Sequence, residues 1–246
     1  MTTTMSVPEI PAPPAATAGK LRPVAHPDLS PILTHFVTRG RPPSKDVPAH
    51  ILAMPPKARL ESILWQGSIS AFVTFSGGNP AVCMTETKFD GLKFLIRDRG
   101  YEPWGLVFSR QGVYDAGGGP VWYTRPAEYA QLSPAQRSWA VRLDPGSDWL
   151  EEREWRVPRP PRLDNEPPKI PLISLGLEAL IVADRTWNCT RLFPFGTKDG
   201  QPAGLYQPLN FHRIPRFWWN PTSQEFRLVR LSGSSRSGLP GGEEDR

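Results

Sequence analysis

The stretch DWLEEREWRVP, residues 148–158, has the alternation expected of a β-strand. In an extended chain, successive side chains point to opposite faces. The charged residues at even positions are therefore expected to share one face: Glu152, Glu154 and Arg156. Trp155 and Val157, with Arg153 before them, fall on the other face, and the two apolar side chains favour burial. Two carboxylates on one strand face repel each other unless a site uses them, so this face is the first candidate for function.

Length and composition favour a folded protein with long loops. A chain of 246 residues suits one large domain or two small ones and can bury a sizeable core. Hydrophobic residues make up 39% of it and nine residues are Trp, whereas 30 Pro and 21 Gly predict extended loops. No stretch has the apolar length of a membrane span, and the Pro- and Ala-rich start does not resemble a secretory signal. We therefore expect no membrane partner.

Cysteine and charge content give two further expectations. Cys83 and Cys189 have no metal-ligand spacing and form no disulfide framework, so we expect no metal site and a reduced, cytoplasmic setting. The net charge is +5 and the isoelectric point is about 9.4. This charge permits an acidic partner such as nucleic acid, but the basic residues are scattered and no nucleic-acid-binding motif is present.

The composition divides the chain into three parts. Residues 1–27 and 232–246 lack apolar periodicity and are expected to be a disordered lead and a disordered tail. Residues 28–231 are expected to form a single α+β domain. Within it, residues 28–158 form the core, and residues 159–231, which begin with a Pro-rich connector, form a C-terminal extension.

Hydrophobic periodicity predicts more strands than helices. Strands are expected at residues 32–37, 69–75, 81–86, 104–110, 120–124, 148–158 and 179–184. Helices are expected at residues 57–67 and 89–100, each ending at a glycine, and around Glu128 and Gln136. The Pro-rich residues 41–56 are expected to be a loop, and the glycines of SGGNP and AGGGP to form hairpin turns. Regular βαβ alternation is missing, so the pattern predicts a split, mainly antiparallel sheet.

Three familiar kinds of catalytic motif are missing from the sequence. Neither glycine-rich segment precedes a helix in the way that a phosphate-binding loop requires. No Cys/His cluster has zinc spacing, and no serine lies in a Gly-x-Ser-x-Gly elbow. We therefore expect neither a zinc enzyme nor a serine hydrolase.

Three other stretches are candidates for a site, and each also has a structural interpretation. His35 lies between apolar neighbours on its strand face, where a satisfied core histidine is common. VCMTET brings Thr85 and Glu86 to the end of an apolar strand, which also suits a Thr-capped helix. On the strand at 148–158, Arg156 beside Glu154 also suits a solvated strand face on which the arginine neutralises the carboxylate.

Taken together, the three stretches resemble the ADP-ribosyltransferase-like fold. They are similar in more detail to abortive-infection proteins of the AbiGi type and related uncharacterised families. The shared motifs are HFVT at residues 35–38, CMTE at 83–86 and WLEEREWR at 149–156. The resemblance covers roughly residues 29–157, about half of the chain, and the last motif is the most specific.

The resemblance implies NAD as a co-substrate and a role for five residues. Glu154 would hold the ribose 2′-hydroxyl and stabilise the oxocarbenium-like transition state, while Glu152 would help to activate the acceptor. His35 would donate a hydrogen bond to the adenosine ribose, and Thr85 would support the nicotinamide end. Arg156 would hold Glu154 in place or bind a phosphate.

The resemblance leaves the activity open. One hypothesis is an NAD-consuming transferase in phage defence or a toxin–antitoxin system, acting on an unidentified protein or nucleic-acid acceptor. The alternative is a catalytically silent, antitoxin-like binding protein on the same scaffold, because fold does not determine function. Its protein partner would bind the aromatic C-terminal surface: Phe217, Trp218 and Trp219. A test of the site hypothesis is whether His35, Thr85 and Glu154 meet in one cleft.

Overall fold

The structure is a computed structural model of the whole chain, and it describes most residues between 20 and 229. The residues described in full are 20–21, 26–38, 46–146, 148–187 and 214–229, and for 193–198 and 201–206 only the backbone is described. The lead and tail expected at the two ends lie almost entirely outside these residues.

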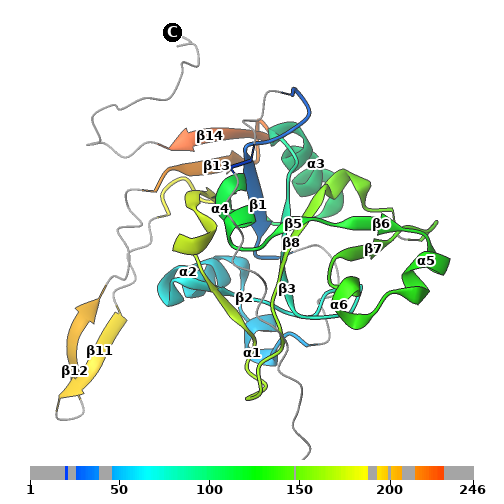
Figure 1. Cartoon of the computed structure of the whole chain (residues 1–246). Helices are drawn as coiled ribbons and strands as arrows, with labels where there is room; N and C mark the ends of the chain where they lie inside the picture. Colours follow the sequence, from blue (N-terminus) through cyan, green and yellow to red (C-terminus); the bar gives the residue numbers. More distant parts are fainter. Residues whose placement is uncertain are drawn as a thin grey trace, which may run out of the picture.

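Eight strands form one large sheet in the order β14-β13-β10-β4-β1-β3-β8-β5 (Figure 1). Their bounds are β1 (Ile32–Phe36), β3 (Ala81–Thr85), β4 (Gly105–Ser109), β5 (Gly119–Pro120), β8 (Glu154–Pro158), β10 (Leu177–Val182), β13 (Arg216–Asn220) and β14 (Glu225–Val229). Neighbouring strands of this sheet are antiparallel except β10 and β13, which are parallel. This confirms the predicted α+β class with a large, mainly antiparallel sheet.

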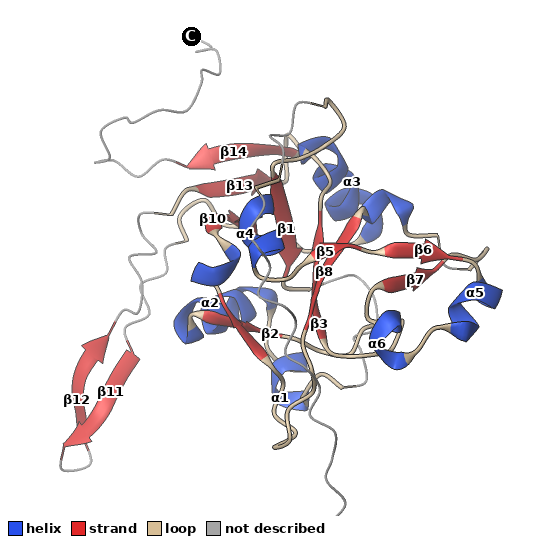
Figure 2. Ribbon diagram, in the orientation of Figure 1, coloured by secondary structure: helices blue, strands red, loops and turns tan. Residues whose placement is uncertain are grey.

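The fold also contains smaller strand pairs and short helices (Figure 2). The pairs are β2 (Ser68–Ser70) with β9 (Lys169–Pro171), β6 (Trp122–Thr124) with β7 (Ala140–Arg142), and β11 (Phe193–Lys198) with β12 (Gln201–Tyr206). The helices are α1 (Ala49–Leu52), α2 (Pro56–Gln66), α3 (Phe89–Arg99), α4 (Arg110–Asp115), α5 (Pro126–Gln131), α6 (Pro134–Arg137) and the one-turn 3-10 helices η1 (Leu150–Glu152) and η2 (Ile173–Leu175). Within the described residues, no helix has the length and apolarity that crossing a membrane requires.

The two longest helices form where the sequence predicts them. In α2, Leu60 and Leu64 are one turn apart and fully buried, and the helix ends at Gly67, whose φ is +61°. In α3, Leu92 and Leu95 are buried on one face. Spacings of three or four residues bring side chains to the same helix face, so each helix covers the sheet with one apolar stripe.

Two hydrophobic clusters hold the sheet and helices together. The larger cluster joins α2 to side chains of β1, β3, β4 and β8: Leu33, Val82, Met84, Leu106, Phe108, Trp155 and Val157 are among its members. The smaller cluster joins α3 to β1, β4 and β10: Phe36, Leu92, Leu95, Tyr101, Val107, Ala179 and Ile181. Trp155 and Val157 are therefore core residues, as the alternation in β8 predicts.

The large sheet is weakly paired at one position, between β1 and β3. Strand β1 has five residue pairs with β4, and β3 has five with β8. Between β1 and β3 the register contains a single pair, Thr34 with Thr85. On one side of this pair β3 ends, and on the other side the two strands have no further residue pair. We call this place the seam of the sheet.

The strand expected at 148–158 is shorter than predicted. Residues Leu150–Glu152 form η1, and the next residue, Arg153, has a φ of +45°. A residue in the left-handed region breaks the two-residue periodicity of an extended chain. The strand therefore begins at Glu154, and Glu152 reaches the site from a helical turn rather than from the same strand face.

Three other element predictions are wrong in part. The strand expected at 69–75 ends at Ser70, and Phe72 makes only an isolated bridge to Ala81. The AGGGP segment is not a hairpin, because α4 intervenes, β4 pairs with β1 and β10, and β5 pairs with β8. The expected loop at 41–56 contains α1, which begins directly after Pro48, a position where a missing N–H costs nothing.

Candidate functional site

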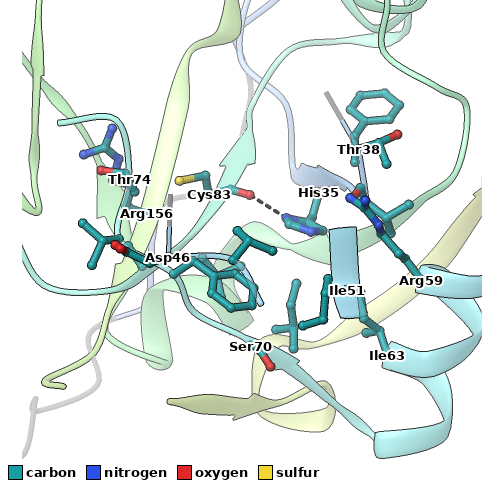
Figure 3. Close-up of a pocket in the computed structure, with 18 of the residues that line it drawn as sticks. His35, Thr38, Asp46, Ile51, Arg59, Ile63, Ser70, Thr74, Cys83 and Arg156 are labelled. Carbon is teal, nitrogen blue, oxygen red and sulfur yellow. Dashed lines mark hydrogen bonds between the residues drawn. The ribbon is translucent and has the colours of Figure 1, made fainter. Parts of the chain in front are cut away.

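A cavity of about 1250 Å³ opens at the seam of the sheet (Figure 3). Its walls come from β1, α1, α2, β2, the loop after β2, β3 and β8. Drug-sized ligands occupy pockets of about 300–1,000 Å³, so this cavity has room for a ligand as long as a dinucleotide. About half of the lining side chains are apolar, and most of the polar ones are uncharged.

Glu154 and Arg156 form a buried, bidentate ion pair in the cavity wall. Arg156 Nε donates to Glu154 Oε1 at 2.9 Å, and an Arg156 terminal nitrogen donates to Oε2 at 3.2 Å. Their side chains are only 7% and 3% exposed, respectively. Arg156 also donates to the carbonyl oxygens of Ser138 and Ala140 at 3.2 and 3.1 Å, and to the Ser76 hydroxyl at 3.3 Å. The orientation of the Glu154 carboxylate is therefore fixed by contacts from several separate segments.

Glu152 lies beside this pair and is held by two hydroxyl groups. The Tyr101 hydroxyl donates to Glu152 Oε1 at 2.6 Å, and the Thr85 hydroxyl donates to the Glu152 carbonyl oxygen. The residue is 4% exposed. Two carboxylates thus line the same cavity, each with its own hydrogen-bond donor.

Tyr123 connects the two carboxylate segments. Its hydroxyl accepts a hydrogen bond from the Glu154 backbone N–H at 3.3 Å and lies 3.5 Å from the Trp149 carbonyl oxygen, to which it donates. Burial raises the pKa of Tyr123 to about 12, and the nearby charges of Glu154 and Glu152 also raise it. The neutral phenol is therefore the form present at physiological pH.

His35 reaches the cavity from β1. Its Nδ1 lies 2.8 Å from the carbonyl oxygen of Cys83 in β3 (Figure 3). A carbonyl oxygen only accepts, so Nδ1 carries the proton and Nε2 of a neutral ring is an acceptor. The expected donation from His35 to a ribose hydroxyl then requires the protonated ring, whereas the neutral ring would accept from that hydroxyl.

The seam explains how His35 and Glu154 come to line the same cavity. The register places Thr34, Thr85 and Glu154 side by side on one face of the sheet, which puts His35 on the opposite face. Side chains on opposite faces of a continuous sheet do not meet. Here β1 and β3 share a single residue pair, and the opening beside it brings the two residues into one cavity.

The structure therefore brings four of the five predicted site residues together. His35, Glu152, Glu154 and Arg156 line the cavity, but Thr85 does not. Thr85 is 6% exposed, and its hydroxyl donates a hydrogen bond to the Glu152 backbone carbonyl oxygen. Its contacts position a carboxylate rather than the nicotinamide end of a ligand.

Glu86 in the CMTE motif lies outside the cavity and belongs to the core. Trp155 Nε1 donates to Glu86 Oε2 at 2.9 Å, and Arg110 Nε lies 3.3 Å from Glu86 Oε1. The Arg110 guanidinium also stacks 5.1 Å from the Trp155 ring centroid. The cluster fixes the indole of β8 on the face opposite Glu154.

The aromatic residues suggested as a partner surface pack largely on their own chain. Phe217 contacts Phe89 with ring centroids 4.9 Å apart, and Trp219 is 6% exposed. Trp218 Nε1 donates to the Ala183 carbonyl oxygen at 3.3 Å. These side chains close the sheet edge near β13 and β14.

Three cavity or near-cavity residues have no distinguishing pattern in the sequence. Tyr101 and Tyr123 lie in segments far from Glu152 and Glu154 along the sequence, and only the folded structure brings their hydroxyl groups close to these residues. Arg59 on α2 is the third, and it lines the cavity far from the carboxylates along the sequence. No group of three or more His, Cys, Asp or Glu side chains in the described part of the chain has the arrangement of a metal site.

Comparisons with known proteins give no relative. Neither the protein-family models, nor the curated proteins, nor the solved structures contain a match to this chain.

Proposed function

We propose that the cavity binds NAD and that the protein is an ADP-ribosyltransferase-like enzyme. One observation carries the proposal: His35 from β1 lines the same cavity as Glu152 and Glu154, which lie at the junction of η1 and β8, although Thr85 does not line it. The motifs at 35–38 and 149–156 support the same function by their resemblance to that fold. Acceptor identity is a separate question, and the resemblance to phage-defence proteins favours a role in abortive infection.

The chemistry suits the two carboxylates. Cleavage of the bond between nicotinamide and ribose leaves its electron pair on nicotinamide and positive charge on the sugar. A carboxylate in a wall of low dielectric stabilises that charge only as it develops, which lowers the barrier. Glu154 is the candidate for this role because Arg156 fixes its orientation. Each carboxylate oxygen can accept more than one hydrogen bond, so the ion pair does not by itself prevent a ribose hydroxyl from donating to Glu154.

Glu152 is the candidate base for the acceptor. The acceptor nucleophile would form a bond to the ribose carbon as nicotinamide leaves, and its proton would pass to Glu152. The Tyr101 hydroxyl, 2.6 Å from Glu152 Oε1, would orient this carboxylate. Water in place of the acceptor would give NAD hydrolysis by the same steps.

A second candidate function is binding without turnover. The observation that favours it is the strength of the Glu154–Arg156 pair, in which the negative charge is already offset and both side chains are nearly fully buried. A neutralised carboxylate stabilises a developing cation less than an unpaired one does. Such a protein would bind a nucleotide in the cavity and act through a partner.

The experiment is an NAD turnover assay on the parent, Glu154→Gln and Glu151→Gln proteins. Glu151 is the matched control, because it precedes Glu152 but pairs with Arg99 and does not line the cavity. If the transferase proposal is right, the parent consumes NAD, Glu154→Gln lowers the rate at least about a hundredfold, and Glu151→Gln keeps it. A thermal melt of each variant checks that it is folded at the assay temperature.

Two outcomes would count against the transferase. An active parent that keeps its rate after Glu154→Gln places the reacting group elsewhere. A parent that binds NAD but releases no nicotinamide, with or without cell extract as the acceptor source, supports the binding protein instead.

A further inference from the structure

Arg59 is a cation in the cavity wall that has no carboxylate partner in the part of the chain that the structure describes. Its hydrogen bonds go to three backbone carbonyl oxygens: Nε to Met54 at 3.0 Å, one terminal nitrogen to Leu52 at 2.9 Å and the other to Val37 at 3.4 Å. A guanidinium has five N–H groups, so these bonds use three and leave two. The side chain is half-buried, and it lines the cavity.

The charged side chains of the cavity are unevenly distributed. Four lining residues are carboxylates, Asp46, Glu102, Glu152 and Glu154, and two are arginines, Arg59 and Arg156. Figure 3 shows Asp46 and Arg156 on one side of His35, and Arg59 with Thr38 on the other. The charge of Arg156 is offset by Glu154, so Arg59 is the cation at the opposite end.

Thr38 adds a second polar group at the Arg59 end. It follows Val37, whose carbonyl oxygen accepts from Arg59, and it also lines the cavity. Its hydroxyl is buried and has no hydrogen-bond partner among the described residues. Buried polar groups are nearly always hydrogen-bonded, so this hydroxyl is a polar group at the Arg59 end whose hydrogen bond the described residues do not supply.

We propose that Arg59 binds the diphosphate of a dinucleotide, with the carboxylates at the nicotinamide end. This inference deepens the proposed function and rests on it for the identity of the ligand. The charge pattern of the cavity matches that of NAD, in which the oxidised nicotinamide ring is positive and the diphosphate is negative. A guanidinium presents its N–H groups in a plane, which suits two oxygens of one phosphate. The three carbonyl contacts hold it in place before a ligand binds.

Arg59 also has a structural role, which the test must separate from binding. It connects α2 to the C-terminal end of α1 and to the end of β1. The carbonyl groups at the C-terminal end of a helix are partly negative, which favours a cation there. A purely structural Arg59 would affect stability and the binding of every ligand equally. A phosphate-binding Arg59 would affect only ligands that carry a phosphate.

The test is titration calorimetry of the parent, Arg59→Gln and Lys57→Gln proteins with NAD, ADP-ribose and adenosine. Lys57→Gln is the matched control, because it removes one positive charge from an exposed position of the same helix that does not line the cavity. We expect Arg59→Gln to weaken NAD and ADP-ribose binding at least about tenfold and to leave adenosine binding unchanged. We expect Lys57→Gln to leave all three within about twofold.

Failure of this inference and failure of the proposed function give different results. Unchanged ADP-ribose affinity in Arg59→Gln, or equal weakening of ADP-ribose and adenosine, overturns the inference and leaves NAD binding intact. A parent that binds neither NAD nor ADP-ribose refutes the proposed function. In that case, binding of inorganic pyrophosphate tests the Arg59 site by itself. Pyrophosphate binding by the parent that is lost in Arg59→Gln supports an anion site at Arg59, and no pyrophosphate binding by the parent overturns the inference.

A second measurement covers the case in which Arg59→Gln does not fold. Increasing salt should weaken ADP-ribose binding to the parent and leave adenosine binding unchanged, because a charged contact is screened. Arg59→Lys keeps the charge and loses the planar donors, so it should retain this salt dependence with a lower affinity. If salt affects the two ligands equally in the parent, no cation binds the diphosphate.

Discussion

Replacing Arg156 with Met should destabilise the protein strongly, because the change leaves the Glu154 charge buried without its partner. Arg156 is 3% exposed and donates two hydrogen bonds to Glu154, two to backbone carbonyl oxygens and one to Ser76. Breaking a buried ion pair by removing one partner typically costs about 3–5 kcal/mol. That is a large part of a domain stability of about 5–15 kcal/mol.

The assay is urea unfolding, with the unfolding free energy obtained by linear extrapolation for four proteins. These are the parent, Arg156→Met, Glu154→Gln and the double variant. Glu154→Gln should cost about 1.5–3 kcal/mol, because Gln keeps one acceptor oxygen but removes the charge. The double variant should cost less than the sum of the two single variants, since each single variant already breaks the pair.

A control variant and a refuting result make this prediction specific. Arg142→Met breaks an ion pair with Asp144, in which the nitrogen and oxygen atoms are 2.7 Å apart and the two side chains are 42% and 21% exposed, respectively. Because surface ion pairs contribute little, this change should lower the unfolding free energy by less than about 1 kcal/mol. If Arg156→Met costs no more than Arg142→Met, the pair does not hold Glu154. If the single costs add in the double variant, Arg156 acts through its carbonyl and Ser76 contacts alone.

Three further predictions concern the core, a titrating group and a helix end. Trp155→Ala should cost about 3–5 kcal/mol in urea unfolding, since the indole is 3% exposed, and a parent-like transition would mean that the indole is not in the core. The pKa of Tyr123 is raised to about 12, so the unfolded chain loses this proton first as pH rises above about 10, and stability should fall between pH 10 and 12. Tyr123→Phe should reduce this fall, and an unchanged pH profile would place the titration elsewhere. Gly67→Ala should cost about 1–2 kcal/mol in the same unfolding assay, because φ is +61° and a Cβ would meet no atom within 4 Å, so only backbone strain acts. Equal stability would show that α2 ends differently.

Local signals predict the parts of the fold in which local and tertiary preferences agree. Helices α2 and α3 combine an apolar stripe with a glycine directly after the last turn, and both form where expected. Strand β1 and strand β10 are apolar runs that the structure buries in the middle of the sheet. In each case one segment determines its own conformation, and packing adds to that preference.

The errors lie where contacts from distant segments decide the backbone. The alternation at 148–153 suits a strand, but Arg153 adopts a positive φ and the Glu152 carbonyl oxygen accepts from Thr85, which is 67 residues away. Helix α4 was missed because it has six residues and contains Gly112, although Ser109 caps it by accepting from the Gly112 N–H. The Thr85 contact is not visible in a local pattern, whereas the Ser109 cap is local but is outweighed by the shortness of the helix and its glycine.

The candidate site divides in the same way. Glu154 and Arg156 are two residues apart on one strand, so alternation places them on one face before any fold is known. Arg59 and Tyr101 have no such relation to the carboxylates, because only the packing of α2 and the segment after α3 brings them near. The exclusion of Thr85 from the cavity likewise depends on a helical turn that the sequence pattern does not predict.

The seam between β1 and β3 makes the width of the cavity depend on the core. With a single residue pair between these strands, the ladder contributes little to holding the two halves of the sheet together. Side chains of the larger cluster do so instead, since Leu33 comes from one half and Met84 from the other. Smaller side chains at such positions would change the width of the opening as well as the stability. If the cavity binds a nucleotide as proposed, natural variation in the core would therefore alter the affinity without any change in the residues that line the cavity.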